Sequence, residues 1–130
     1  MDYIKISEHE FPTMLAITAE EQEQGLMFKK WPPPVMVFVY GEPRINKFWM
    51  KGTPSPLDII FCHAGKVISI ESGEPYSTKI IGDNRFSDLV IEMPLGTCKA
   101  HEIKIGNSVE LKCCQDSLMK IFMRKNGLLI

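Results

Sequence analysis

The sequence predicts a mainly-β protein, a compact β-roll or small barrel with a short N-terminal helix and a C-terminal helix. Many short apolar, β-branched segments are separated by turn residues, and no alternation of strands with long helices suggests βαβ units. With 130 residues, of which 45% are hydrophobic, the chain can bury one ordinary core. We expect one β-rich domain over residues 1–115, with residues 116–130 forming an amphipathic helix and a tail packed on it.

The N-terminal part predicts a strand, a short helix and a second strand. The segment TMLAIT at 13–18 is typical of a strand, and Thr18 then begins a T-x-x-E capping box with Glu21. We therefore expect a helix, AEEQEQ, that begins at Ala19 and ends at the following glycine, which suits a C-terminal cap. After a proline-rich linker, VMVFVY at 35–40 predicts a strand that is buried on both faces or nearly so.

The middle of the chain predicts another strand and a hairpin. NKFWMK at 46–51 is expected to be a strand in which Trp49 and Lys51 face one way and the residues between and before them face the other. LDIIFCH at 57–63 and VISIE at 67–71 flank a short AGK turn, which is the clearest hairpin in the sequence. We expect these two strands to pair with each other.

The next segments predict a long loop and several short elements. Residues 72–87 have weak periodicity and several turn residues, which indicates a loop with a brief extended piece near KII. DLVIEM at 88–93 is expected to be a strand that ends at a proline. GTCKAHEI then predicts one helical turn, and KIGNSVEL predicts a turn followed by a strand.

The C-terminal segment predicts an amphipathic helix. From residue 116, DSLMKIFMRKNG begins with a capping residue, places Leu118, Ile121 and Phe122 on one stripe, and ends with basic residues. We expect the apolar stripe to dock on the sheet. An alternative is that the basic residues bind an anionic surface.

Charge, hydropathy and cysteine usage restrict the classes of function. A formal net charge of −1 argues against a general nucleic-acid binder. No apolar run approaches the roughly 18 residues that span a bilayer, and the acidic N-terminus has no signal-peptide core, so we expect a cytoplasmic protein without a transmembrane segment. The cysteines show no CxxC pair, so we expect reduced thiols, no metal site and no cofactor. They are Cys62, Cys98, Cys113 and Cys114.

Two carboxylates in apolar strands are the most informative polar residues. Asp58 lies within PLDIIF and Glu92 within LVIEMP, where a carboxylate must find donors or raise its pKa. Lys51 lies across the GTPSP loop from Asp58, and one interpretation is an ion pair between them that fixes the loop. The other is that these three residues converge beside Trp49 as a polar cluster in a groove, with Met27 on its rim.

The ordered segments GLMFKK, VMVFVY, FWMKGTPSPLDIIF, GKVISIE, LVIEMPLGT and KIGNSVEL resemble those of domain of unknown function 192, also called uncharacterised protein family 0127. The resemblance extends over about residues 11–111. It implies a compact β-rich domain, and it implies little about activity because the family is uncharacterised. The family usually has Asn after its WMK motif, and this chain has Gly52.

Three hypotheses about function follow. The sequence has no P-loop, GxGxxG, GxSxG or HExxH motif, so we prefer a non-catalytic binding module for a polar small molecule, a glycan or a peptide. Its groove would be lined by Trp49, Lys51, Asp58 and Glu92, with Met27 on the rim. The alternatives are a small enzyme, in which Asp58 or Glu92 is the acid–base group beside Lys51, and an assembly subunit that oligomerises through its C-terminal helix.

Overall fold

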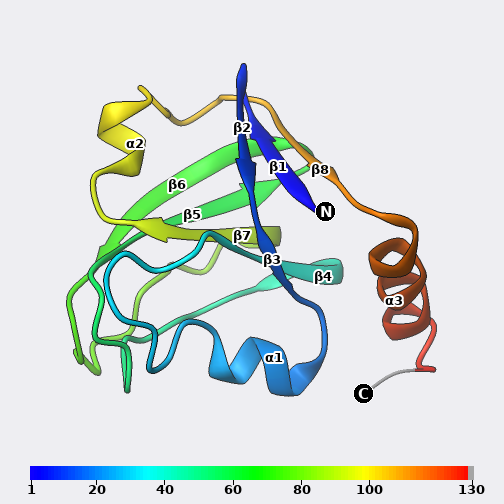
Figure 1. Ribbon diagram of the computed structural model, residues 1–130, viewed down its shortest axis with the longest axis horizontal. Coiled ribbons are helices and arrows are strands. Elements are labelled where there is room, and N and C mark those ends of the chain that lie inside the picture. The colour runs from blue at the N-terminus through cyan, green and yellow to red at the C-terminus, as the bar shows by residue number, and fades with distance from the viewer. Residues whose placement is uncertain (129–130) are drawn as a thin grey trace.

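The computed structural model describes residues 1–128 and consists of two β-sheets and three helices (Figure 1). The strands are β1 (Tyr3–Ile6), β2 (His9–Pro12), β3 (Met14–Ala16), β4 (Met36–Ile45), β5 (Leu57–His63), β6 (Lys66–Gly73), β7 (Phe86–Pro94) and β8 (Val109–Lys112). The helices are α1 (Ala19–Gln24), α2 (Thr97–Ala100) and α3 (Gln115–Lys125). The predicted mainly-β class with a short N-terminal helix and a C-terminal helix is confirmed. Over residues 1–128 the strands form two sheets and do not close into a barrel.

The larger sheet has the strand order β3-β4-β7-β5-β6, and the smaller sheet has the order β2-β1-β8. Neighbouring strands are antiparallel except β3 and β4, which are parallel. The predicted hairpin is confirmed, because β5 pairs with β6 through a turn at Ala64 and Gly65 with φ angles of 49° and 76°. A two-residue hairpin turn of type I′ has positive φ at both positions, and glycine adopts such a φ without strain.

The larger sheet is buried on both faces because different elements cover each face. On one face, Ile4 and Ile6 of β1 pack with Ile60 and Ile91 of the larger sheet. On the other face, the residues after α1 and the segment 46–53 form a second apolar cluster. Figure 1 shows the smaller sheet above the larger one and α1 below it. This double cover explains why β5 is almost continuously apolar.

The capping box at the start of α1 is confirmed. The Glu21 N–H donates to Thr18 Oγ1 at 3.1 Å, and the Thr18 N–H donates to Glu21 Oε1 at 3.0 Å. The helix ends before Gly25, which has a φ of 51° and donates its N–H to the Glu21 carbonyl. The capping box and Gly25 therefore determine where α1 begins and ends. Burial contributes little to the helix, because none of its residues is buried.

The expected strand over 46–51 is wrong. Within the described chain this segment makes one antiparallel bridge, between Phe48 and Ile81, and otherwise lies as an extended cover over the sheet face. The expected alternation of side chains is present, since Met50 is fully buried and Trp49 is 46% exposed. The pairing of β4 with β7 shifts register between Val39 and Arg44, just before this segment, and the chain then leaves the sheet and crosses its face.

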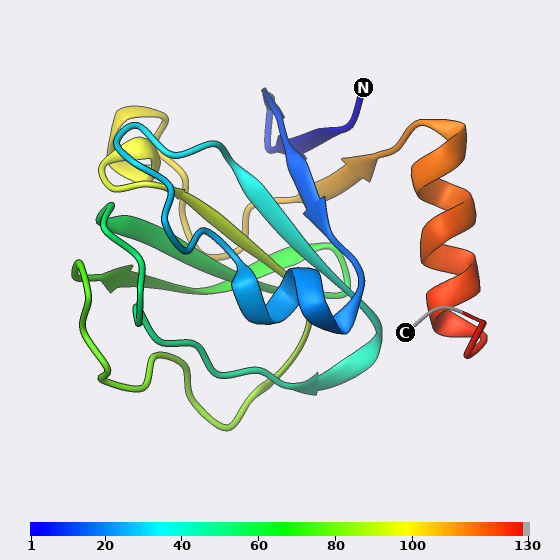
Figure 2. The same cartoon turned by 60° about the horizontal axis from the view of Figure 1, so that its bottom comes forward.

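Helix α3 lies beside β4, at one side of the molecule, in both ribbon views (Figures 1 and 2). Polar contacts anchor its first turns. The Asp2 carboxylate accepts hydrogen bonds from the Cys114 N–H at 2.9 Å and from Ser117 Oγ at 2.8 Å. Lys120 Nζ lies 2.9 Å from Glu21 Oε2, so an ion pair joins α3 to α1.

The apolar stripe that we expected to dock is largely exposed. Leu118 is 52% exposed and Phe122 is 57% exposed, and only Ile121 of the three is partly covered. The prediction is wrong for Leu118 and Phe122 because the side of α3 that meets the body carries polar anchors instead. The expected tail includes residues 129–130, which lie outside the described residues. No helix of residues 1–128 has the length and apolar character needed to cross a bilayer.

Candidate functional site

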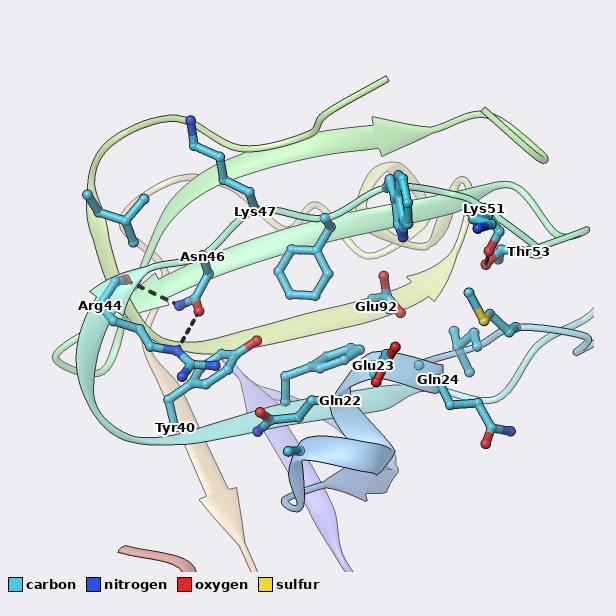
Figure 3. Close-up of a pocket in the computed structure, with 18 of the residues that line it drawn as sticks. Gln22, Glu23, Gln24, Tyr40, Arg44, Asn46, Lys47, Lys51, Thr53 and Glu92 are labelled. Carbon is cyan, nitrogen blue, oxygen red and sulfur yellow. Dashed lines mark hydrogen bonds between the residues drawn. The ribbon is translucent and has the colours of Figure 1, made fainter. Parts of the chain in front are cut away.

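A pocket of about 520 Å³ opens between α1, the far part of β4 and the segment 46–53. Its floor is the face of the larger sheet that the smaller sheet does not cover. Figure 3 shows Glu92 near its centre, with Tyr40, Arg44 and Asn46 together at one end and Lys51 at the other. The pocket therefore combines groups from α1, β4, the segment 46–53, β7 and α3, the last through Arg124.

Glu92 forms the polar part of the floor. It lies on β7 opposite Met36 and Ile59, so its side chain is on the α1 face of the sheet. Only 4% of the residue is exposed, and among residues 1–128 no hydrogen bond or ion pair reaches its carboxyl group. Burial raises the pKa of Glu92 to about 8. The carboxyl is therefore mostly protonated at neutral pH, and it faces the pocket without a partner.

The backbone of Gly25 lies close to this carboxyl. A Cβ atom at position 25 would lie 3.6 Å from Glu92 Oε1 and 3.3 Å from the Phe38 ring. The residue also has a positive φ of 51°, which side chains rarely adopt. Glycine at this position therefore lets α1 end directly above the floor while space remains beside the carboxyl.

Aromatic side chains form the walls around Glu92. The rings of Phe38 and Phe48 meet edge to face with centroids 5.0 Å apart. Trp49 stands at the rim, and Tyr40 projects from β4 towards the pocket. Burial raises the pKa of the Tyr40 hydroxyl, so it is neutral and can donate or accept a hydrogen bond.

One end of the pocket holds a fixed guanidinium group. Arg44 Nε donates to Asn46 Oδ1 at 3.0 Å, and the guanidinium carbon lies 4.2 Å from the centroid of the Tyr40 ring. Asn46 is itself held, because its Nδ2 donates to Ser87 Oγ at 2.7 Å. Stacking and hydrogen bonding of this kind orient an arginine for an anionic group.

Further basic residues line the rim, and no carboxylate of residues 1–128 forms an ion pair with any of them. The ammonium group of Lys51 lies over the Trp49 ring at 5.3 Å from its centroid, a cation–π arrangement. The basic residues that line the pocket are Arg44, Lys47, Lys51 and Arg124, and the acidic ones are Glu23 and Glu92.

A second hollow, also of about 520 Å³, continues from the first towards α3. Tyr40, Arg44 and Arg124 line both hollows, so the two lie side by side at these residues. Lys125 and Glu42 complete the charged lining of the second hollow. The basic character of the pocket thus increases from the floor towards α3.

Four of the five residues expected at the site line this pocket. They are Trp49, Lys51, Glu92 and Met27. Their role in binding stays a prediction, but the side chains do share one cavity. The signals that identified them were the FWMK motif and a carboxylate within an apolar strand.

Asp58 is not part of the pocket. It pairs with Met93 on the opposite face of the sheet, and its Oδ2 accepts hydrogen bonds from Gly96 N–H at 3.1 Å and Cys98 N–H at 3.0 Å. The predicted Lys51–Asp58 ion pair is therefore wrong. The reason is the sheet register, because Asp58 lies opposite the neighbour of Glu92 and so faces the other way.

The arginine end of the pocket was not predicted from the sequence. Tyr40 could have been found from the alternation in VMVFVY, which puts it on the same face as Met36, the residue opposite Glu92. No sequence signal places Arg44 and Asn46, because they reach the pocket through the irregularity in β4. Arg124 arrives through the docking of α3, which local patterns do not predict.

The donor set suits hydrogen bonding and charge recognition. Within residues 1–128, no three His, Cys, Asp or Glu side chains gather to form a metal site. The pocket offers one buried carboxyl, one neutral phenol, one oriented guanidinium and three further cations. Such a set can recognise a ligand that has both donor and acceptor groups.

Comparison with known proteins shows the family. A crystal structure of a protein of unknown function from Novosphingobium aromaticivorans DSM 12444 matches with a TM-score of 0.78, 31% identity, and coverage of 83% of each chain. A candidate transcription regulator from Sinorhizobium meliloti 1021 matches with a TM-score of 0.78 and 30% identity, over 84% of this chain and 92% of that one. No curated protein matches significantly. Residues 3–111 match the family described as Uncharacterized ACR, COG1430, so this chain belongs to the DUF192 family.

Proposed function

We propose that this protein is a non-catalytic binding domain whose pocket takes a polar ligand. The main support for the proposal is the environment of Glu92. This residue is 4% exposed, its carboxyl group has no hydrogen-bond or ion-pair partner in residues 1–128, and it faces a cavity of about 520 Å³. Because this carboxyl opens onto the cavity, a ligand that supplies a hydrogen bond can pair with it directly.

Among a polar small molecule, a glycan and a peptide, the cavity favours the small molecule. Its volume lies within the range of about 300–1,000 Å³ that is usual for small-molecule sites. The mixture of aromatic walls and a few convergent polar groups is also typical of such sites. Glycans and short peptides belong in the same screen, because the second hollow lengthens the groove.

A thermal-shift screen of polar small molecules, oligosaccharides and short peptides tests the proposal. We expect ligands that raise the melting temperature of the wild type to lose this effect with Trp49→Ala or Lys51→Ala. The matched controls are Trp31→Ala and Lys79→Ala, which change exposed residues outside the pocket. If both pocket variants bind every ligand as the wild type does, the proposed groove is wrong.

A small enzyme is a second candidate, favoured by the raised pKa of Glu92. Burial brings this pKa to about 8, close to the range in which a carboxyl group can exchange a proton at neutral pH. Asp58 does not join it, because that carboxylate binds backbone N–H groups on the other face. An NMR titration that places Glu92 near its ordinary pKa, with no turnover in broad hydrolase assays, would exclude this candidate.

An assembly role is favoured by α3. Its outer surface exposes Leu118, Met119 and Phe122 by 52%, 52% and 57%. Exposed apolar side chains on one helix are a common feature of protein contacts. Analytical ultracentrifugation of the wild type and of a chain ending at residue 115 tests this role. A wild type that is monomeric at high concentration contradicts self-assembly.

We also propose a cytoplasmic location. Its support is that all four cysteines are free, two of them buried, since reducing compartments keep thiols in this form. Fractionation of source cells with an antibody to the protein tests the location, and recovery outside the cytoplasmic fraction would contradict it.

A further inference from the structure

We propose that the ligand of this pocket is a small zwitterion, whose ammonium group binds Glu92 and whose anionic group binds Arg44 and Arg124. The inference rests on the proposed function and specifies the chemistry of the ligand. It comes from the distribution of charge in the cavity, with a carboxyl at the floor and, at the rim, bases that form no ion pair with any carboxylate of residues 1–128.

The floor favours a positively charged donor. Within the described chain no side chain pairs with the Glu92 carboxyl, so this group is available to a donor of the ligand. The faces and edges of Phe38, Phe48 and Trp49 surround the same space, and aromatic rings attract organic cations. Lys51 provides an internal example, because its ammonium group already lies over the Trp49 ring at 5.3 Å. A compact ammonium group can therefore pair with the Glu92 carboxylate and also make cation–π contacts with the aromatic walls.

Binding of an ammonium group requires the Glu92 carboxylate to be charged. The charged and titratable groups that line the same pocket are Glu23 from α1, Tyr40 and Arg44 from β4, Lys47 and Lys51 from the segment 46–53, and Arg124 from α3. None of them forms an ion pair with Glu92 in residues 1–128. The ligand's ammonium group would therefore be the counter-charge that lets Glu92 release its proton to solvent.

The rim favours an anion at the end near α3. Arg44 is oriented by Asn46 at 3.0 Å and by the Tyr40 ring at 4.2 Å, and no carboxylate of the described residues pairs with it. Arg124 lines both hollows alongside it. Four bases and one acid line the rim, so an isolated cation would be repelled there while a carboxylate or phosphate would be attracted.

The test compares probes that differ in charge. Dissociation constants are measured through Trp49 fluorescence in a Trp31→Phe background, which leaves one tryptophan. The probes are γ-aminobutyrate and ε-aminocaproate as zwitterions, n-pentylamine as a cation and hexanoate as an anion. We expect the better zwitterion to bind at least about tenfold more tightly than either singly charged probe, because each end adds a charge-assisted hydrogen bond.

Variants locate each end of the probe. Glu92→Gln is expected to weaken binding of the zwitterion about tenfold or more, and to weaken it more than Glu23→Gln, which changes the acid at the rim. Arg44→Gln is expected to weaken the zwitterion and to leave n-pentylamine unchanged or tighter. Arg124→Gln provides a second test of the anionic end if Arg44→Gln fails to fold.

The inference is overturned if hexanoate or n-pentylamine binds as tightly as both zwitterions, if Glu23→Gln has the larger effect, or if no zwitterion binds. The proposed function fails separately. If screened compounds lose binding with Trp49→Ala but none of them carries an ammonium group, the binding domain stands and the zwitterion does not. If no compound of the screen binds at all, both proposals fail.

Discussion

Replacing Glu92 with Gln should remove a pH dependence of stability that the wild type shows around neutrality. Burial raises the pKa of this carboxyl from 4.5 to about 8 in the folded chain. Between these values the folded protein holds the proton and the unfolded chain has released it. The stabilising contribution of Glu92 is therefore complete below pH 4.5 and is lost as the pH rises through about 8.

The size of the effect follows from proton linkage. When the folded state holds one proton more than the unfolded state, the free energy of unfolding falls by about 1.4 kcal/mol for each unit by which the pH rises. From about pH 5 to about pH 8, the wild type should lose roughly 3–4 kcal/mol relative to Glu92→Gln. The amide is close in shape to a protonated carboxyl and carries no charge, so the two proteins should be nearly equal at the acidic end.

Urea denaturation at a series of pH values measures this difference directly. Other groups that titrate in the same range contribute equally to both proteins and cancel in the comparison. Glu74→Gln is the matched control, because Glu74 is exposed and lies outside the pocket. A difference between wild type and Glu92→Gln that stays constant from about pH 5 to about pH 8 would contradict this prediction, because it would mean that the folded and unfolded carboxyl groups titrate alike.

Three further substitutions test how the contacts described above contribute to the stability of the fold. Asp58→Ala should lower the free energy of unfolding by about 3 kcal/mol, because the buried N–H of Cys98 and that of Gly96 lose their acceptor; an unchanged urea midpoint would contradict this. Thr18→Ala should cost about 1 kcal/mol through loss of the helix cap, measured in the same way. Gly73→Ala should cost about 1–3 kcal/mol, because a Cβ there would collide with the fully buried Met50 side chain; a melting temperature equal to the wild type would show that Met50 can move.

The parts of the fold that local chemistry determines could be predicted from the sequence. The T-x-x-E box and the glycine after it gave both ends of α1. The apolar runs around AGK gave the β5–β6 hairpin because the turn itself fixes the pairing. The segment 46–51 has the alternation of a strand, but alternation does not tell whether a segment joins a sheet edge or covers a sheet face. That choice depends on the bend in β4, which is a tertiary property.

The candidate site was predicted in part for a similar reason. Trp49, Lys51 and Glu92 stood out because their types are unusual in their local contexts, and all three line the pocket. Asp58 stood out in the same way but lies on the other face, since only the register between β5 and β7 decides the direction of each carboxylate. Arg124 could not be predicted, because its position depends on how α3 packs against the body.

The carboxylate of Glu21 has a consequence for the shape of the pocket. One of its oxygens caps α1, and the other pairs with Lys120 of α3, with both side chains more than a third exposed. The helix that carries Arg124 is thus tied to α1, which forms one wall of the pocket, by an ion pair that dissolved salt weakens. Ionic strength should therefore control how widely the groove opens at its α3 end, so that the ligand affinity of the domain varies with the salt content of its surroundings even for an uncharged ligand.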